Sequence, residues 1–80
     1  MGDMQLDAVS VGKAIARIRH KRGITQDVLS GLSDIGRTHL SAIERGERKP
    51  SLETIWRIAA AMDIPPSQIV LEIEKVIREQ

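Results

Sequence analysis

Apolar residues recur every three or four positions along most of the chain, which is the spacing of amphipathic helices. Five stretches follow this period, and Gly, Pro, Ser and Asp positions that favour turns separate them. No stretch alternates apolar and polar residues in the manner of a strand. The pattern predicts an all-α domain with helices over about 10–22, 25–33, 37–44, 51–63 and 66–78.

Residues at the predicted helix ends agree with these limits. A serine or threonine hydroxyl can accept a hydrogen bond from an unpaired N–H of the first turn, so we expect N-caps at Ser10, Thr25 and Ser51. Gly46 is placed to end the third helix, because glycine adopts the left-handed conformation without steric penalty. The second helix is expected to bury one apolar stripe that comprises Val28, Leu29 and Leu32.

The last two helices carry more apolar residues than one small domain needs. Trp56 and Met62 lie on the wide apolar face of the fourth helix and are expected in the core or in a dimer contact. Four residues of the fifth helix follow helical spacing and are expected to form a homodimer interface: Ile69, Ile73, Val76 and Ile77. Dimerisation would enlarge the core of a chain whose 80 residues bury only a limited share of their surface.

Length and charge refine this picture. The chain is long enough for one domain, predicted over residues 9–80 after a flexible leader over residues 1–8. The 12 basic and 11 acidic residues give a net charge of only +1, but five basic residues lie between positions 13 and 22, where no acid occurs. Positive charge is thus concentrated in the first two thirds of the chain, as expected of a surface that binds a polyanion.

Several classes of site lack the residues they need. The sequence has no cysteine, and its two histidines lie on different predicted helices without a paired acidic motif. It has no glycine-rich phosphate loop or nucleophile elbow, so we expect no catalytic residue, no metal site and no cofactor. No apolar run is long enough to span a membrane and no signal peptide is recognisable, so we expect no membrane partner and a cytoplasmic location.

Residues 25–46 are the most informative stretch, because their pattern predicts two short helices joined by a tight bend. The second helix turns Leu40 and Ile43 inward and presents hydrogen-bond donors outward, which suits the major groove of DNA. The sequence here resembles the Cro/C1-type (XRE) helix-turn-helix family, in RIRHKRGITQDVLS (17–30) and RTHLSAIERGERKPSLETI (37–55). It also resembles restriction-modification controller proteins, with which it shares RT-x-x-S-x-IER.

The resemblance implies a compact five-helix, lambda-repressor-like domain with the second and third helices as the helix-turn-helix. It implies that Arg37 and Thr38 contact base edges. It implies that Gln26 contacts the DNA backbone and braces the recognition helix, although a capping partner or a plain surface glutamine is the alternative. It also implies a structural ion pair between Arg19 and Glu44, which would tie two helices together without reading DNA.

Further candidates for DNA contact come from the same region. Ser41 is one turn beyond Arg37 and shares its exposed face. His39 can touch a phosphate or a thymine methyl, or simply remain exposed. The basic loop after the recognition helix is expected to make one or two phosphate contacts, although charge there can also serve solubility; it contains Arg45, Arg48 and Lys49.

We therefore expect a sequence-specific transcriptional regulator that binds double-stranded DNA as a homodimer on a palindromic operator, with half-sites ~34 Å apart. One alternative is an antitoxin that binds a toxin partner through its last helix and represses its own operon. Another is a domain that serves protein interaction alone. A protein partner, either a toxin or RNA polymerase, stays open, and no enzyme activity is expected.

Overall fold

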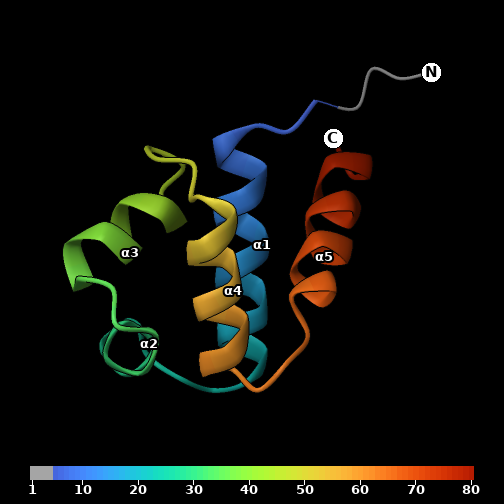
Figure 1. Cartoon of the computed structure of the whole chain (residues 1–80). Helices are drawn as coiled ribbons and strands as arrows, with labels where there is room; N and C mark the ends of the chain where they lie inside the picture. The colour runs from blue at the N-terminus through green and yellow to red at the C-terminus, as the bar shows by residue number, and fades with distance from the viewer. Residues whose placement is uncertain (1–4) are drawn as a thin grey trace.

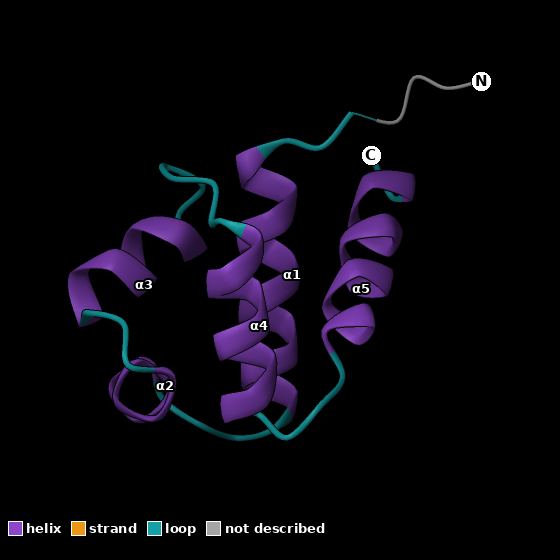
Figure 2. Ribbon diagram, in the orientation of Figure 1, coloured by secondary structure: helices purple, strands orange, loops and turns teal. Residues whose placement is uncertain are grey.

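A computed structural model describes residues 5–80, which form five helices and no strand (Figures 1 and 2). The helices are α1 (Ala8–Lys21), α2 (Gln26–Ser33), α3 (Arg37–Glu44), α4 (Leu52–Ala61) and α5 (Pro66–Arg78). This confirms the all-α prediction. In Figure 1, α2 and α3 lie on one side of α1 and α4, and α5 lies on the other. No helix within residues 5–80 is long and apolar enough to cross a membrane.

The first helix begins earlier than the sequence predicted. Asp7 is its N-cap: one carboxylate oxygen accepts from the Ser10 backbone N–H at 2.7 Å, and the other accepts from the Ser10 hydroxyl at 2.9 Å. The prediction of Ser10 as the cap was therefore wrong, because α1 begins at Ala8 and Asp7 caps it, which places Ser10 inside the first turn of the helix. These hydrogen bonds lower the pKa of Asp7. The first four residues of the expected leader lie outside the described residues.

The caps of the other helices follow the prediction more closely. The Thr25 and Ser51 hydroxyls each accept a backbone N–H at 3.1 Å, from Val28 and Thr54 respectively. Gly46 follows α3 with a φ of +78°, as expected of a glycine at a helix C-terminus. Three of the five helices thus begin at a side-chain cap, which satisfies donors that the helix itself leaves unpaired.

The core lies where α1, α4 and α5 meet and extends under α3, and isoleucine is its most frequent residue. In α2 only Leu29 of the expected stripe is buried, whereas Val28 and Leu32 are exposed. Ser30 and Ser33 take the inward positions instead, because their hydroxyls donate to backbone carbonyls of their own helix. Small hydroxyl side chains let α2 lie close to its neighbours.

The apolar residues of α4 and α5 are divided between the core and the surface differently from the prediction. Trp56 is 58% exposed and does not join the core, although Met62 does. Three of the four residues predicted as a dimer interface are buried within the chain: Ile69, Ile73 and Val76. They pack in the core between α5, α1 and α4, so the prediction of an interface role was wrong for Ile69 and Val76, which have almost no exposed surface. Ile73 is buried as well but lines an apolar groove, as does the partly buried Ile77. The exposed apolar residues of α5 are Val70 and Leu71.

Ion pairs and hydrogen bonds join α5 and the residues that follow it to α1. The Arg17 guanidinium donates to both carboxylate oxygens of Glu79 and lies 3.5 Å from the buried Glu72. The packing of α5 against α1 places Arg17 in this ion pair. The pairing lowers the pKa of Glu79. Gln80 extends the contact, since its amide donates to the Ser10 hydroxyl at 2.7 Å.

Gly12 permits the closest approach between α1 and α3. A Cβ atom built on Gly12 would lie 2.2 Å from the Ile43 carbonyl oxygen and 2.8 Å from that of Glu44. A Cβ atom does not approach a nonbonded oxygen this closely, and the backbone carbonyls cannot rotate away as a flexible side chain would. The absence of a side chain at this position therefore sets how deeply the C-terminal end of α3 sits against α1.

We expect Gly12→Ala to destabilise the protein by about 1–3 kcal/mol, because α3 must move away from α1. Gly31→Ala is the matched control. Gly31 also lies within a helix but has open space around it, so alanine should stabilise the fold by up to about 1 kcal/mol through helix propensity. Urea unfolding of both variants at one protein concentration measures the difference. Equal stability of Gly12→Ala and the wild type would contradict the steric argument.

Candidate DNA-binding surface

Helix α3 is buried on one side and polar on the other. Leu40 and Ile43 are fully buried, and Ala42 is almost so. The opposite side exposes Arg37, Thr38 and His39 near the start of the helix, and Ser41 is partly exposed one turn later. The structure thus brings the predicted contact residues of this helix onto one outward surface. Thr38 and His39 make no side-chain hydrogen bond to the described residues.

Arg19 and Glu44 form a buried ion pair that joins the end of α1 to the end of α3. The Nε and Nη2 atoms of Arg19 donate to the two Glu44 carboxylate oxygens at 2.7 and 2.9 Å. Both side chains are less than a tenth exposed. A third donor, Nη1, binds the carbonyl oxygen of Ile24 at 2.9 Å, which ties in the turn before α2. The hydrogen bonds to Glu44 raise the pKa of Arg19.

Gln26 extends this pair toward the start of α3. Its Nε2 atom donates to Glu44 at 2.8 Å, and its Oε1 atom accepts from Nε of Arg37 at 2.9 Å. The two neighbours decide the orientation of the amide, because Glu44 can only accept and Arg37 can only donate. Gln26 therefore braces both ends of α3 from α2. This is the bracing role that the family resemblance implied.

Arg37 also has a partner that the sequence did not indicate. Its Nη1 atom donates to the Asp27 carboxylate at 2.8 Å, and both side chains are more than half exposed. Asp27 lies in the first turn of α2. Ten positions separate the two residues, and only the bend between α2 and α3 brings them together.

The loop after α3 separates the three predicted basic contacts. Arg45 forms an exposed ion pair with Glu47 and donates to the Ser41 hydroxyl, and its guanidinium lowers the pKa of Glu47. Arg48 is exposed and has no ion-pair partner among residues 5–80. Lys49 differs from the prediction, because its ammonium turns to the carbonyl oxygen of Leu6 at 2.9 Å. The loop packs there against the N-terminal segment.

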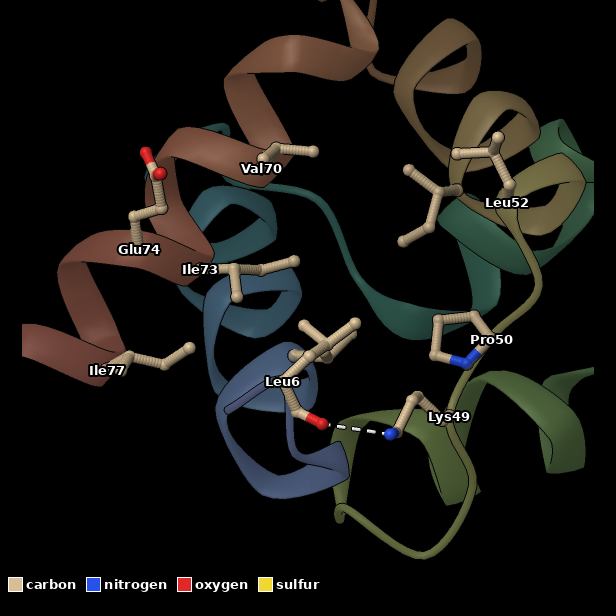
Figure 3. Close-up of a pocket in the computed structure, with 10 residues that line it drawn as sticks. Leu6, Lys49, Pro50, Leu52, Val70, Ile73, Glu74 and Ile77 are labelled. Carbon is tan, nitrogen blue, oxygen red and sulfur yellow. Dashed lines mark hydrogen bonds between the residues drawn. The ribbon is translucent and has the colours of Figure 1, made fainter. Parts of the chain in front are cut away.

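Lys49 also lies at the edge of an apolar groove between α4, α5 and the N-terminal segment (Figure 3). The groove has a volume of about 330 Å³. Its exposed apolar lining includes Leu6, Leu52 and Val70, and Ile77 contributes a partly buried side chain. Glu74 lies on the α5 side and Lys49 on the loop side (Figure 3). On the outer face of α4, Trp56 continues this apolar surface beyond Leu52.

Within residues 5–80, no three His, Asp or Glu side chains gather in a way that could hold a metal ion. The polar side chains that do gather are paired arginines and carboxylates, joined by one glutamine. This arrangement holds the exposed guanidinium of Arg37 in a fixed orientation, as expected of a binding surface.

Helices α2 and α3 form a helix-turn-helix, and comparison with known proteins gives the class of this protein as DNA-binding transcriptional regulators. The helix-turn-helix family HTH_3 matches residues 15–69, which include α2, α3 and α4. The chain belongs to this family. It is 33% identical over 60 residues to y4dJ of Sinorhizobium fredii, which is named as an uncharacterized HTH-type transcriptional regulator. That match covers 75% of this chain and 78% of the relative.

Solved structures give the same family assignment. The restriction-modification controller protein C.AhdI from Aeromonas hydrophila superposes with a TM-score of 0.75 and 34% identity, over 78% of this chain and 94% of that one. The controller protein C.Esp1396I, solved as a tetramer with its natural 35 base-pair operator, gives a TM-score of 0.81 and 27% identity. That match covers 89% of this chain and 93% of the controller protein. The resemblance to controller proteins is thereby confirmed.

The buried ion pair makes a prediction about stability. Glu44→Gln leaves the Arg19 charge buried without a carboxylate, so we expect a loss of about 3–5 kcal/mol in the free energy of unfolding. Glu53→Gln removes an exposed carboxylate that lies 3.4 Å from Arg57, and it should cost less than about 1 kcal/mol. Chemical denaturation of both variants measures the contrast. Similar losses for the two would mean that burial does not determine the strength of the pair.

Proposed function

We propose that this protein is a transcriptional regulator that recognises a specific sequence in double-stranded DNA, with α3 as the helix that enters the major groove. The observation that carries the proposal is the bracing of α3, whose two ends are joined to α1 and α2 through Glu44, Gln26 and Arg37. An α-helix with its side chains is about 10–12 Å across, comparable with the width of the major groove. Its outward donors would face base edges.

The proposed roles follow from where each side chain lies. Arg37 and Thr38 at the start of α3 would read base edges, and His39 and Ser41 would contact bases or the backbone. Arg48 and Arg45 would contact phosphates, since both are exposed in the loop that follows α3. Gln26 would act chiefly by holding Arg37, because both ends of its amide already have protein partners. Lys49 is not included, because it binds the N-terminal segment.

We also propose that the protein acts as a homodimer on a two-fold symmetric operator. The surface that would meet the second copy is the apolar groove with Leu52, Val70 and the adjoining Trp56. Opposite charges lie at its two sides, Lys49 on the loop side and Glu74 on the α5 side. A two-fold arrangement of identical copies can pair each charge with its opposite on the partner. The small core of an 80-residue chain gives a further reason to bury this surface.

The first experiment is selection of bound duplexes from a random DNA pool with the purified chain. A palindromic motif with half-sites about 10 base pairs apart would support a dimeric reader of successive major grooves. Recovery of no preferred sequence would overturn the proposal of specific DNA recognition.

Arg37→Ala tests the readout by α3. It should cost about 1–3 kcal/mol of binding to the selected duplex and relax base preference at one position in each half-site. Arg48→Ala is the contrasting variant: it should weaken binding to all duplexes and lower the slope of log affinity against log salt by about one. An unchanged selected motif with Arg37→Ala would contradict base readout by this residue.

Val70→Asp tests the dimer surface. Val70 is exposed, so a charge there should leave the fold intact and yield monomers in analytical ultracentrifugation. Leu71→Asp is the matched control, because Leu71 is exposed on the next position of α5 but does not line the groove. Dimers in Val70→Asp would place the interface elsewhere. A wild-type chain that is monomeric but forms a stable complex with a different protein would instead favour the toxin-binding alternative.

A further inference from the structure

The guanidinium of Arg37 is only partly engaged by its two protein partners. Its Nε atom binds the Gln26 amide oxygen at 2.9 Å and its Nη1 atom binds the Asp27 carboxylate at 2.8 Å. A guanidinium carries five N–H groups, so three remain for other acceptors. The side chain is therefore oriented and locally neutralised, yet it can still donate to a further acceptor.

Asp27 makes its contact with Arg37 from an exposed position. It lies in the first turn of α2, and its side chain is 77% exposed, so the core does not depend on it. Its other carboxylate oxygen accepts no hydrogen bond from residues 5–80. The carboxylate also lies on the surface that would approach the negatively charged DNA backbone. A carboxylate at this position weakens association with DNA of any sequence, so a benefit from Asp27 has to come from something other than general affinity.

We propose that Asp27 is a specificity-determining residue, which lowers binding to non-cognate DNA by restraining Arg37. The inference rests on the proposed function and deepens it. In a non-cognate complex, Arg37 would gain most by reaching a phosphate, but the carboxylate beside it repels that phosphate and already holds the guanidinium. In the cognate complex, the remaining N–H groups bind a base edge while Asp27 keeps its own hydrogen bond.

The physical basis is a difference between two binding free energies. Non-specific affinity comes almost entirely from cations that neutralise phosphates and release counterions. A cation that is already paired contributes little to this term, whereas a bidentate contact to a base adds a term that only the correct sequence supplies. Pairing Arg37 with Asp27 thus reduces the contribution from phosphate contacts more than the contribution from base contacts. The ratio of cognate to non-cognate affinity therefore increases.

A second exposed ion pair on the same side provides an internal comparison. Arg45 and Glu47 are exposed to a similar extent and lie in the loop after α3. Arg45 uses its Nε, Nη1 and Nη2 atoms on Glu47 and Ser41, and it lies beyond the end of the helix. Removing the Glu47 charge should therefore strengthen binding to every duplex alike. Glu47→Gln is the matched control for a general electrostatic effect.

The test compares Asp27→Asn with the wild type and with Glu47→Gln. Affinities are measured over a salt series for the duplex that the wild type selects from a random pool and for a scrambled duplex of equal length. Asp27→Asn should lower the ratio of the two affinities by about two- to fivefold, the range expected of one exposed ion pair. Its salt slope on the scrambled duplex should steepen by about 0.9, as one more phosphate is neutralised.

Two further variants separate positioning of Arg37 from other effects. Asp27→Glu keeps the carboxylate and should preserve the affinity ratio. In an Arg37→Met background, Asp27→Asn should no longer change that ratio, because no guanidinium remains to be restrained. Thermal unfolding of each variant verifies that it is folded at the temperature of the binding assay.

The outcomes distinguish this inference from the proposed function. A wild type that selects no duplex would overturn the proposed function itself. A wild type that discriminates, together with an Asp27→Asn variant that strengthens binding to both duplexes equally, would overturn the role of Asp27 alone. A change of ratio that persists in the Arg37→Met background would also overturn it.

Discussion

The ion pair between Arg19 and Glu44 is the contact on which the arrangement of the helix-turn-helix depends. Glu44 ends α3, and its carboxylate receives donors from α1 and from α2 at once. An eight-residue helix with two fully buried side chains has little packing of its own to define its rotation. The close approach at Gly12 sets the distance between α3 and α1, and the ion pair sets the orientation of α3 against α1. The outward residues of α3 are therefore presented by a rigid support.

Most exposed arginines of this chain already have carboxylate partners. Arg37, Arg45 and Arg57 each form an ion pair with an exposed carboxylate, so part of the surface positive charge is offset locally. The 12 basic and 11 acidic residues of the chain give a net charge of only +1. A broad field of unpaired positive charge would bind any DNA with similar affinity. A nearly neutral surface with a few oriented donors favours discrimination between sequences over general affinity.

The two surfaces proposed for binding lie on different elements. The candidate DNA-binding residues come from α2, α3 and the following loop, whereas the apolar groove lies between α4, α5 and the N-terminal segment. The core connects them, because α1 packs against both α3 and α5. A dimer formed through the groove would hold two α3 helices at a fixed separation, which is how half-site spacing is read.

The sequence by itself determined the number and order of the helices, most of their ends and the helix-turn-helix. These features depend on local chemistry: the 3.6-residue period, the hydroxyl caps at Thr25 and Ser51, and Gly46 after α3. The ion pair between Arg19 and Glu44 could be predicted only from the family resemblance, because the two residues are 25 positions apart and no local sequence pattern connects them.

Tertiary structure decided which apolar and charged residues face the solvent. A helical period marks an apolar face but not the neighbour that covers it, so Ile69 and Val76 were assigned to a partner although α1 and α4 bury them. Trp56 also lies on an apolar helical face and was expected in the core or in a dimer contact. It is exposed because none of the helices within residues 5–80 covers that part of α4. The contact of Arg37 with Asp27 likewise exists only because the bend between α2 and α3 brings their first turns together. Periodicity is a property of one helix, whereas burial and ion pairing belong to the packing of several.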